Sequence, residues 1–180
     1  MKVNQHIFSF EEYASIDELS ATDSNLLRKA REATVDAYAP YSHFHVGAAA
    51  LLQNGLIVTG TNQENASYPV GICAERVLLA AVASQHKNVP VISIAVSYDN
   101  LGGESNHPVA PCGMCRQSLV EFESRMNQPI RLILAGKQGK VLVIDNATSL
   151  LPFAFEKNEL DKKTDFHTKQ QKDNIAPGSL

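Results

Sequence analysis

Two short segments hold all three cysteines of this chain: Cys73-Ala74-Glu75-Arg76 and, further on, Pro111-Cys112-Gly113-Met114-Cys115-Arg116-Gln117. Three thiolates with a nearby carboxylate are typical of a catalytic zinc site, because a structural zinc site usually closes its fourth position with another Cys or His. Such a site leaves one coordination place for water. We therefore expect the chain to fold around a metal ion held by these two segments.

The spacing of the cysteines suits the first turns of two helices. Cys112 and Cys115 lie three residues apart, so both sulfurs fall on one helix face, where unpaired backbone N–H groups and the helix dipole favour thiolates. Cys73 begins another predicted helix in the same way. Two such helix starts can deliver three thiolates to one zinc ion, and Glu75 would then lie beside the metal as acid and base, not as a ligand.

The surplus negative charge of three thiolates on one Zn²⁺ would oppose the ionisation of bound water. Arg76 is placed to offset this charge by donating to the sulfurs, and Arg116 is a second candidate. The alternative for both arginines is an ordinary surface ion pair. An alternative for the whole site is a closed structural zinc centre with His107 as its fourth ligand.

The bulk composition fits one ordinary domain. The chain has 180 residues, 44% of them hydrophobic, and a formal net charge of -3, so it lacks the basic surface that binds nucleic acid or an anionic membrane. No secretory signal or membrane-spanning apolar stretch is apparent, and we expect a cytoplasmic protein. In that reducing compartment an odd number of cysteines at C-x-x-C spacing favours metal binding over disulfides.

Helical and strand periods alternate along the chain, which predicts an α/β fold: a three-layer α/β/α sandwich around one mixed sheet of about five strands. Asp23 or Ser24 is expected to cap a first helix that Pro40 ends. Asn54-Gly55 between two apolar runs predicts a hairpin with a type I′ turn, in which both central residues have positive φ. Further helices are expected from Cys73 and Cys112, and further strands over 91–96, 130–135 and 141–145.

The chain is expected to divide into three parts. These are an N-terminal extension over 1–21, a zinc domain over 22–156, and a polar, flexible C-terminal tail over 157–180. The loop between the strand over 91–96 and Pro111 is long and rich in glycine.

Five motifs in order resemble those of the cytidine deaminases, from about residue 24 to residue 156. They are Tyr38 to Gly47, Asn62 to Tyr68, Cys73 to Arg76, Pro111 to Gln117, and Leu150-Leu151-Pro152 with Phe155. The cysteine pattern alone would indicate only the wider zinc deaminase superfamily. All five motifs together indicate the enzymes that act on free nucleosides. The long loop before Pro111 departs from the family pattern and could alter access to the site.

The resemblance implies zinc-dependent, hydrolytic deamination of cytidine and 2′-deoxycytidine to uridine and 2′-deoxyuridine, with release of ammonia, in pyrimidine salvage. In the family, water activated by one zinc ion per subunit adds to C4 of the pyrimidine. The zinc ligands match Cys73, Cys112 and Cys115. The glutamate that matches Glu75 carries the proton of that water to N3 and later protonates the departing amine.

The resemblance also implies the residues that hold the substrate. The amide and carboxylate that match Asn62 and Glu64 hold the ribose hydroxyls, which suits their capacity to accept and donate hydrogen bonds. The stacking phenylalanine of the family falls on Phe44. The backbone N–H that matches Ala74 approaches the carbonyl of the base.

Assembly is implied by three further matches. Tyr68 and Phe155 match aromatic residues that enter the site of a neighbouring subunit. Cys73 stands where some relatives have His, which resembles the homotetrameric form with three cysteines.

Three other functions compete with this interpretation. Deaminases of a cytosine-bearing antibiotic such as blasticidin S share the cysteine segments, but they replace the ribose-holding sequence found here as Asn62-x-Glu64-Asn65. A non-catalytic zinc-binding interaction module would have no use for Glu75. Polynucleotide editing is opposed by the acidic charge of the chain.

Overall fold

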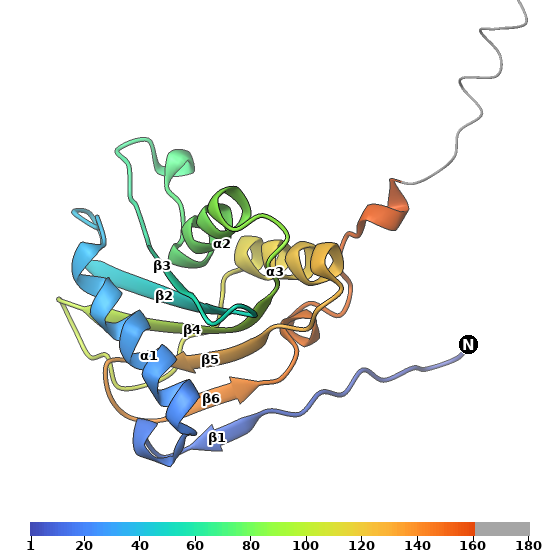
Figure 1. Cartoon of the computed structure of the whole chain (residues 1–180), viewed down its shortest axis with the longest axis horizontal. Coiled ribbons are helices and arrows are strands. Elements are labelled where there is room, and N and C mark those ends of the chain that lie inside the picture. Colours follow the sequence, from blue (N-terminus) through green and yellow to red (C-terminus); the bar gives the residue numbers. More distant parts are fainter. Residues whose placement is uncertain (161–180) are drawn as a thin grey trace, which may run out of the picture.

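The computed structural model describes residues 1–160, and one six-stranded sheet runs through their centre (Figure 1). The strands are β1 (Glu11–Tyr13), β2 (Phe44–Leu52), β3 (Ile57–Thr61), β4 (Val91–Asn100), β5 (Arg131–Ala135) and β6 (Val141–Ile144), in the order β1-β6-β5-β4-β2-β3. Among these six strands of the described residues, only β4 and β5 pair in parallel. Helix α1 (Ala21–Ala33) lies on one face, and α2 (Ala74–Gln85) and α3 (Gly113–Met126) lie on the other. The predicted α/β fold with a mixed sheet is confirmed.

The number of strands differs from the prediction of about five. The additional strand is β1, which pairs antiparallel with β6 along the edge of the sheet. Lys140, directly before β6, forms a salt bridge with Glu12 of β1 at 2.6 Å. A strand of three residues is too short to show a period of two in the sequence. β1 lies within the predicted extension over 1–21, and the division of the chain into three parts stays a prediction.

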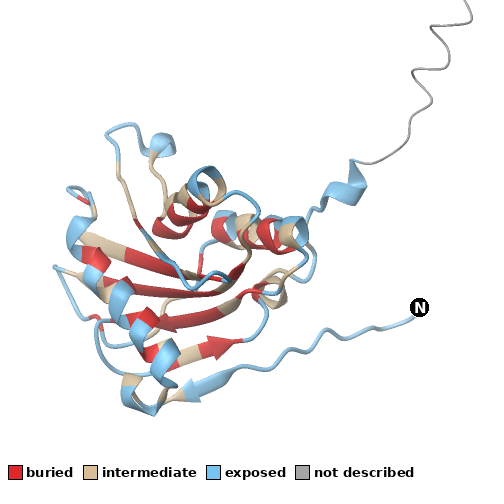
Figure 2. Ribbon diagram, viewed as in Figure 1, coloured by how far each residue is buried: buried red, intermediate tan, exposed pale blue. Residues whose placement is uncertain are grey.

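Successive residues of the central strands are buried, as the red stretches of β2, β4 and β5 in Figure 2 show, so both faces of the sheet are covered. On β2, Ala48 and Ala50 pack into the hydrophobic cluster of α2 and α3, whereas Ala49 packs with α1. Small residues on the strands also let the helices approach the sheet closely. A Cβ at Gly60 of β3 would lie 2.5 Å from the backbone nitrogen of Leu78 on α2. The close approach of α2 to β3 places the start of α2 at the end of the sheet.

Two local details differ from the predictions. Helix α1 is capped by Ser20, whose hydroxyl accepts a hydrogen bond from the backbone N–H of Asp23 at 3.1 Å, so capping by Asp23 or Ser24 is wrong. The helix begins earlier because Ser20 satisfies a free N–H of the first turn. It also ends at Ala33, before a 3₁₀ turn over Thr34–Asp36, and does not reach Pro40.

The hairpin between β2 and β3 is confirmed, but its type I′ turn is wrong. Of its two central residues, Asn54 and Gly55, only Gly55 has a positive φ, of 85°. The N–H of Gly55 donates to the carbonyl of Leu52 at 2.9 Å. This arrangement is typical of a type I turn followed by a glycine bulge, in which one glycine alone takes the left-handed conformation.

No helix in the described part of the chain is long and apolar enough to cross a membrane. The segment after β6 runs through two 3₁₀ turns, Ala147–Leu150 and Lys157–Glu159. The remainder of the tail predicted to be flexible, residues 161–180, lies outside the described residues.

Candidate metal centre and ligand cavity

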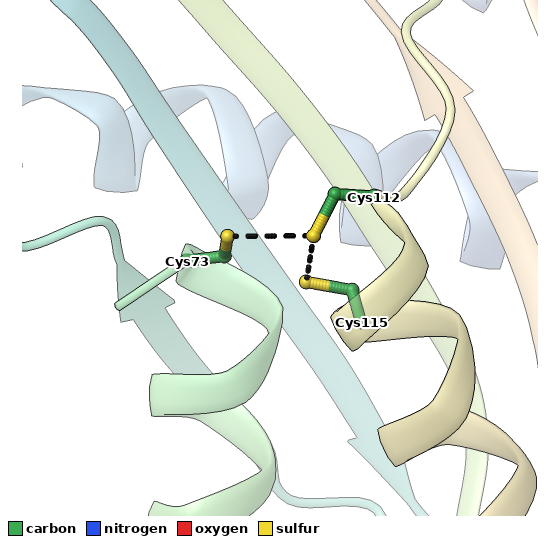
Figure 3. Close-up of side chains that lie close together, drawn as sticks. All are labelled: Cys73, Cys112 and Cys115. Carbon is green, nitrogen blue, oxygen red and sulfur yellow. Dashed lines mark hydrogen bonds between the residues drawn. The ribbon is translucent and has the colours of Figure 1, made fainter. Parts of the chain in front are cut away.

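The three cysteines meet where α2 and α3 begin (Figure 3). Cys73 is the N-cap of α2, Cys112 is the N-cap of α3, and Cys115 lies in the first turn of α3. The sulfur of Cys112 lies 3.7 Å from that of Cys73 and 3.4 Å from that of Cys115. The folded chain therefore brings together sulfurs that are 39 residues apart in sequence.

These sulfurs fit a zinc ion. Zinc–sulfur bonds of about 2.3 Å at tetrahedral angles place two ligand sulfurs about 3.8 Å apart, close to the separations found here. Among residues 1–160, the cluster of candidate ligands contains these three cysteines and no His, Asp or Glu. His107 is instead within hydrogen-bond distance of the Tyr98 hydroxyl, at 3.3 Å. A closed centre with His107 as its fourth ligand is therefore not supported, and one position is left open.

The surroundings of the sulfurs act unequally: they favour a thiolate at Cys73 and oppose one at Cys115. Neither helix start has a side-chain cap, so N–H groups of the first turns stay free to face the sulfurs. The hydrogen bond with Cys115 lowers the pKa of the Cys73 thiol to about 6, although burial opposes this shift. The same hydrogen bond, together with burial, raises the pKa of Cys115. Cys73 therefore ionises more readily than Cys115, whose proton a bound cation would displace.

Glu75 lies in the first turn of α2, directly beside the sulfurs. It is only 5% exposed, and burial raises the pKa of its carboxyl group. A raised pKa moves a carboxyl group toward the range in which it can both take up and release a proton. The position and environment of Glu75 therefore suit a proton carrier at the metal.

The two arginines of the cysteine segments behave differently. The charge of Arg76 contributes to lowering the pKa of the Cys73 thiol, but within residues 1–160 no hydrogen bond joins it to a sulfur. Arg116 donates from Nε to the carbonyl of Pro111 at 2.8 Å and from Nη1 to the carbonyl of Leu150 at 3.2 Å. Within residues 1–160, Arg116 makes neither a hydrogen bond to a sulfur nor an ion pair. It instead joins the segment before Cys112 to the C-terminal part of the domain.

A cavity of about 550 Å³ opens beside the sulfurs, a size that suits a small molecule. Most of the predicted site residues border it: Phe44, Asn62, Glu64, Tyr68, Cys73, Ala74, Glu75 and Cys112. The cavity also has an apolar wall that the sequence analysis missed, formed by Val46, Val96, Val109 and Ala110. Strand periodicity marks Val46 and Val96 as core residues, but their place at a cavity depends on how β2 and β4 pair.

Asn62 joins its segment to β2. Its Oδ1 accepts from the N–H of Val46 at 2.7 Å, and its Nδ2 donates to the carbonyl of Phe44 at 2.9 Å. The amide thereby takes the place of a strand residue in the hydrogen-bond ladder. Each of its two polar atoms retains capacity for one further hydrogen bond.

Glu64 holds the loop that precedes β2. Its carboxylate accepts from the N–H groups of Tyr41 and Ser42, at 2.9 Å and 3.2 Å, and from the Ser42 hydroxyl. The hydroxyl of Ser42, more than any other group, lowers the pKa of Glu64. Glu64 is therefore ionised at neutral pH. Three of its roughly four acceptor sites are used within the chain.

The two aromatic residues predicted to reach a neighbouring subunit lie in different places. Tyr68 is 77% exposed at the edge of the cavity, where its ring meets that of Tyr41 edge-on with centroids 6.0 Å apart. Phe155 does not border this cavity. Its carbonyl accepts from Gln117 of α3 at 2.7 Å, and its side chain is exposed.

Comparison with known proteins places this site in a known context. Residues 20–128 match the family model described as the cytidine and deoxycytidylate deaminase zinc-binding region, which agrees with the zinc-binding geometry of the cysteines. The chain is 38% identical over 136 residues to the cytidine deaminase of Halalkalibacterium halodurans, covering 76% of this chain and 96% of that protein. It is 41% identical over 113 residues to the cytidine deaminase of Mycobacterium tuberculosis H37Rv, covering 61% and 80%. The crystal structure of cytidine deaminase from Burkholderia pseudomallei superposes with a TM-score of 0.63 at 38% identity, covering 76% of this chain and 100% of that one.

Proposed function

This chain belongs to the cytidine and deoxycytidylate deaminase family, and we propose that it hydrolyses the 4-amino group of cytidine and 2′-deoxycytidine in pyrimidine salvage. The observation that carries the proposal is the buried Glu75 beside three sulfurs, in the same cavity as Phe44, Asn62 and Glu64. A non-catalytic zinc module does not agree with membership in a family of hydrolytic enzymes.

The reaction consumes one water and releases one ammonia. When bound, the zinc ion supplies Lewis acidity, which promotes the loss of a proton from water at neutral pH. Glu75 takes this proton and passes it to N3 of the pyrimidine while the water oxygen bonds to C4. The proton of the new C4 hydroxyl then moves through the same carboxylate to the amine. The C4–N bond breaks, a C4 carbonyl forms, and ammonia leaves.

The ribose would be held by those hydrogen-bond donor and acceptor sites of Asn62 and Glu64 that are not used within residues 1–160. Glu64 has about one acceptor site free for a ribose hydroxyl, and it is ionised at neutral pH because its pKa is lowered. Asn62 can add one donor and one acceptor. Because both side chains also hold the segment that carries Phe44, binding of the sugar is coupled to the position of the base.

The base would lie between Phe44 and the start of α2. Phe44 borders the cavity and offers an aromatic surface for a planar pyrimidine. Ala74 is the first residue of α2, and helix N–H groups of the first turn have no partner within the helix. The Ala74 N–H is thus available to the carbonyl oxygen of the base.

A homotetramer completes the proposal. Tyr68 and Phe155 are 77% and 60% exposed, and large exposed aromatic side chains are typical of residues that a partner covers. We expect each to enter the site of a neighbouring copy. Light scattering should give a tetrameric mass for active protein, and an active monomer would refute this assembly. Because unpaired cysteines are typical of a reducing compartment, we place the enzyme in the cytoplasm.

Zinc-loaded protein tests the activity directly. Ammonia release and the ultraviolet change from cytosine to uracil should be followed with cytidine, 2′-deoxycytidine, free cytosine and blasticidin S. We expect turnover of the two nucleosides and little of the free base, which cannot use Asn62 and Glu64. Turnover of blasticidin S alone would replace the proposal with an antibiotic deaminase, and no turnover of either nucleoside would refute it.

A further inference from the structure

A second aromatic ring packs on Phe44, and the mechanism above gives it no role. Tyr98 of β4 stacks on Phe44 of β2 with ring centroids 4.7 Å apart and planes inclined by 15°. In the pairing of β2 with β4, Tyr98 lies opposite Val46, so Tyr98 and Phe44 are diagonal neighbours on the face covered by α2 and α3. Tyr98 is 1% exposed and does not border the cavity. One face of the Phe44 ring is therefore covered by protein, and the rest of the ring faces the cavity.

The Tyr98 ring is held in turn by His107. The phenol oxygen lies 3.3 Å from Nδ1 of His107, and the two rings meet edge-on with centroids 5.9 Å apart. A buried tyrosine hydroxyl needs such a partner, because an unpaired one loses its hydration without compensation. His107 thus fixes the orientation of the ring that packs on Phe44.

The loop that carries His107 is itself anchored. Its backbone packs on the turn between β5 and β6, where Cβ atoms at Gly136 and Gly139 would lie 2.2 Å and 2.1 Å from the carbonyl oxygens of Ser105 and Asn106. The N–H of Gln138 also donates to the carbonyl of Ser105 at 3.2 Å. This close approach makes His107 a fixed partner for Tyr98 even though it lies in a long loop.

We propose that Tyr98, held by His107, is a positioning residue that keeps the Phe44 ring in place as the stacking surface for the pyrimidine base. The inference rests on the proposed function. A stacking surface contacts the base equally before and during the reaction, so its loss raises KM and leaves kcat nearly unchanged. Tyr98 is therefore expected to affect substrate binding without affecting the metal or Glu75.

The first test is Tyr98→Leu, which removes the ring beneath Phe44. Loss of an aromatic pair predicts an increase in KM for cytidine of about 3- to 10-fold, with kcat changed less than about 2-fold and the zinc content unchanged. Phe122→Leu is the matched control, because Phe122 is a buried ring in the hydrophobic cluster of the same sheet face and does not border the cavity. It should lower Tm and leave KM unchanged.

The second test separates the hydroxyl from the ring. His107 is exposed, so His107→Ala should fold, but it leaves the buried Tyr98 hydroxyl unpaired and should raise KM. Adding Tyr98→Phe removes that hydroxyl and retains the ring, so the double variant should return toward the wild-type KM. A residue with only a structural role would show this rescue in Tm and not in KM.

Unchanged KM in Tyr98→Leu, or equal losses of kcat and kcat/KM, would overturn the inference. Should Tyr98→Leu fail to fold, the His107→Ala variant and its rescue decide the question in the same way. An inactive wild type would refute the proposed function and this inference with it. An active wild type whose KM is insensitive to these changes would refute this inference alone.

Discussion

Glu75→Gln is expected to lower kcat by about 10² to 10⁴, the usual contribution of a general acid and base. Glutamine has the shape of glutamate and fills the same buried place, but it cannot carry a proton from water to N3 or to the amine. KM for cytidine should change little, because Glu75 acts on the reacting atoms more than on substrate binding. Steady-state kinetics with cytidine measure both parameters.

Measuring the zinc content of the variant distinguishes loss of the proton carrier from loss of the metal. Glu75 is not expected to bind the metal, so the variant should retain about one zinc per chain, measured by elemental analysis after gel filtration. Glu121→Gln is the matched control, since Glu121 is an exposed glutamate on α3 and should leave kcat unchanged. If Glu75→Gln lost its zinc, Glu75 would be a ligand; if it kept full turnover, the assigned proton path would be wrong.

Cys112→Ser is expected to abolish zinc retention and, with it, deamination. Removing a residue that only supports a metal ligand costs about 10- to 100-fold in affinity, and loss of a ligand itself should cost more. Cys112 is the N-cap of α3 and has no capping hydrogen bond. Serine is among the best N-cap residues, so this change should make the helix start more stable by up to about 1 kcal/mol.

The zinc affinity should fall while the stability of the zinc-free protein rises, and these opposite changes distinguish metal loss from misfolding. Competition with a chromogenic chelator measures the zinc affinity, and thermal unfolding of the zinc-free proteins measures the helix start. Ser124→Ala, an exposed change on the same helix, should alter neither. Stoichiometric zinc in Cys112→Ser would show that Cys112 is not a ligand, whereas a lower Tm of the zinc-free protein would contradict the capping argument.

Local chemistry explains why the metal site could be predicted well. An N-cap position and a spacing of three residues place a side chain within a single helical turn, so Cys112 and Cys115 follow from the sequence once the helix is recognised. Arg116 shows the limit of this reasoning. Its partner carbonyl on Leu150 is 34 residues away, and no local pattern indicates which backbone group a guanidinium will reach.

The secondary structure likewise contains elements that local sequence signals predict and elements that depend on distant residues. The helices that begin after Cys73 and Cys112 were predicted, because their apolar spacing and caps are local signals. The edge strand β1 was not, because three residues carry no measurable period and its pairing with β6 joins segments about 130 residues apart. The hairpin at Gly55 was predicted, but its turn type depends on the φ of a single neighbouring residue.

By itself, the sequence determined the chemistry of this protein: three thiolates that can hold zinc, one carboxylate beside them, and a family pattern. The tertiary structure decided the form of the cavity, because its walls come from distant segments. Phe44 is paired with Tyr98 only by the register of β2 on β4, and Tyr98 with His107 only by the packing of a long loop. A reactive group is a property of its residue type, whereas a binding surface exists only once the chain has packed.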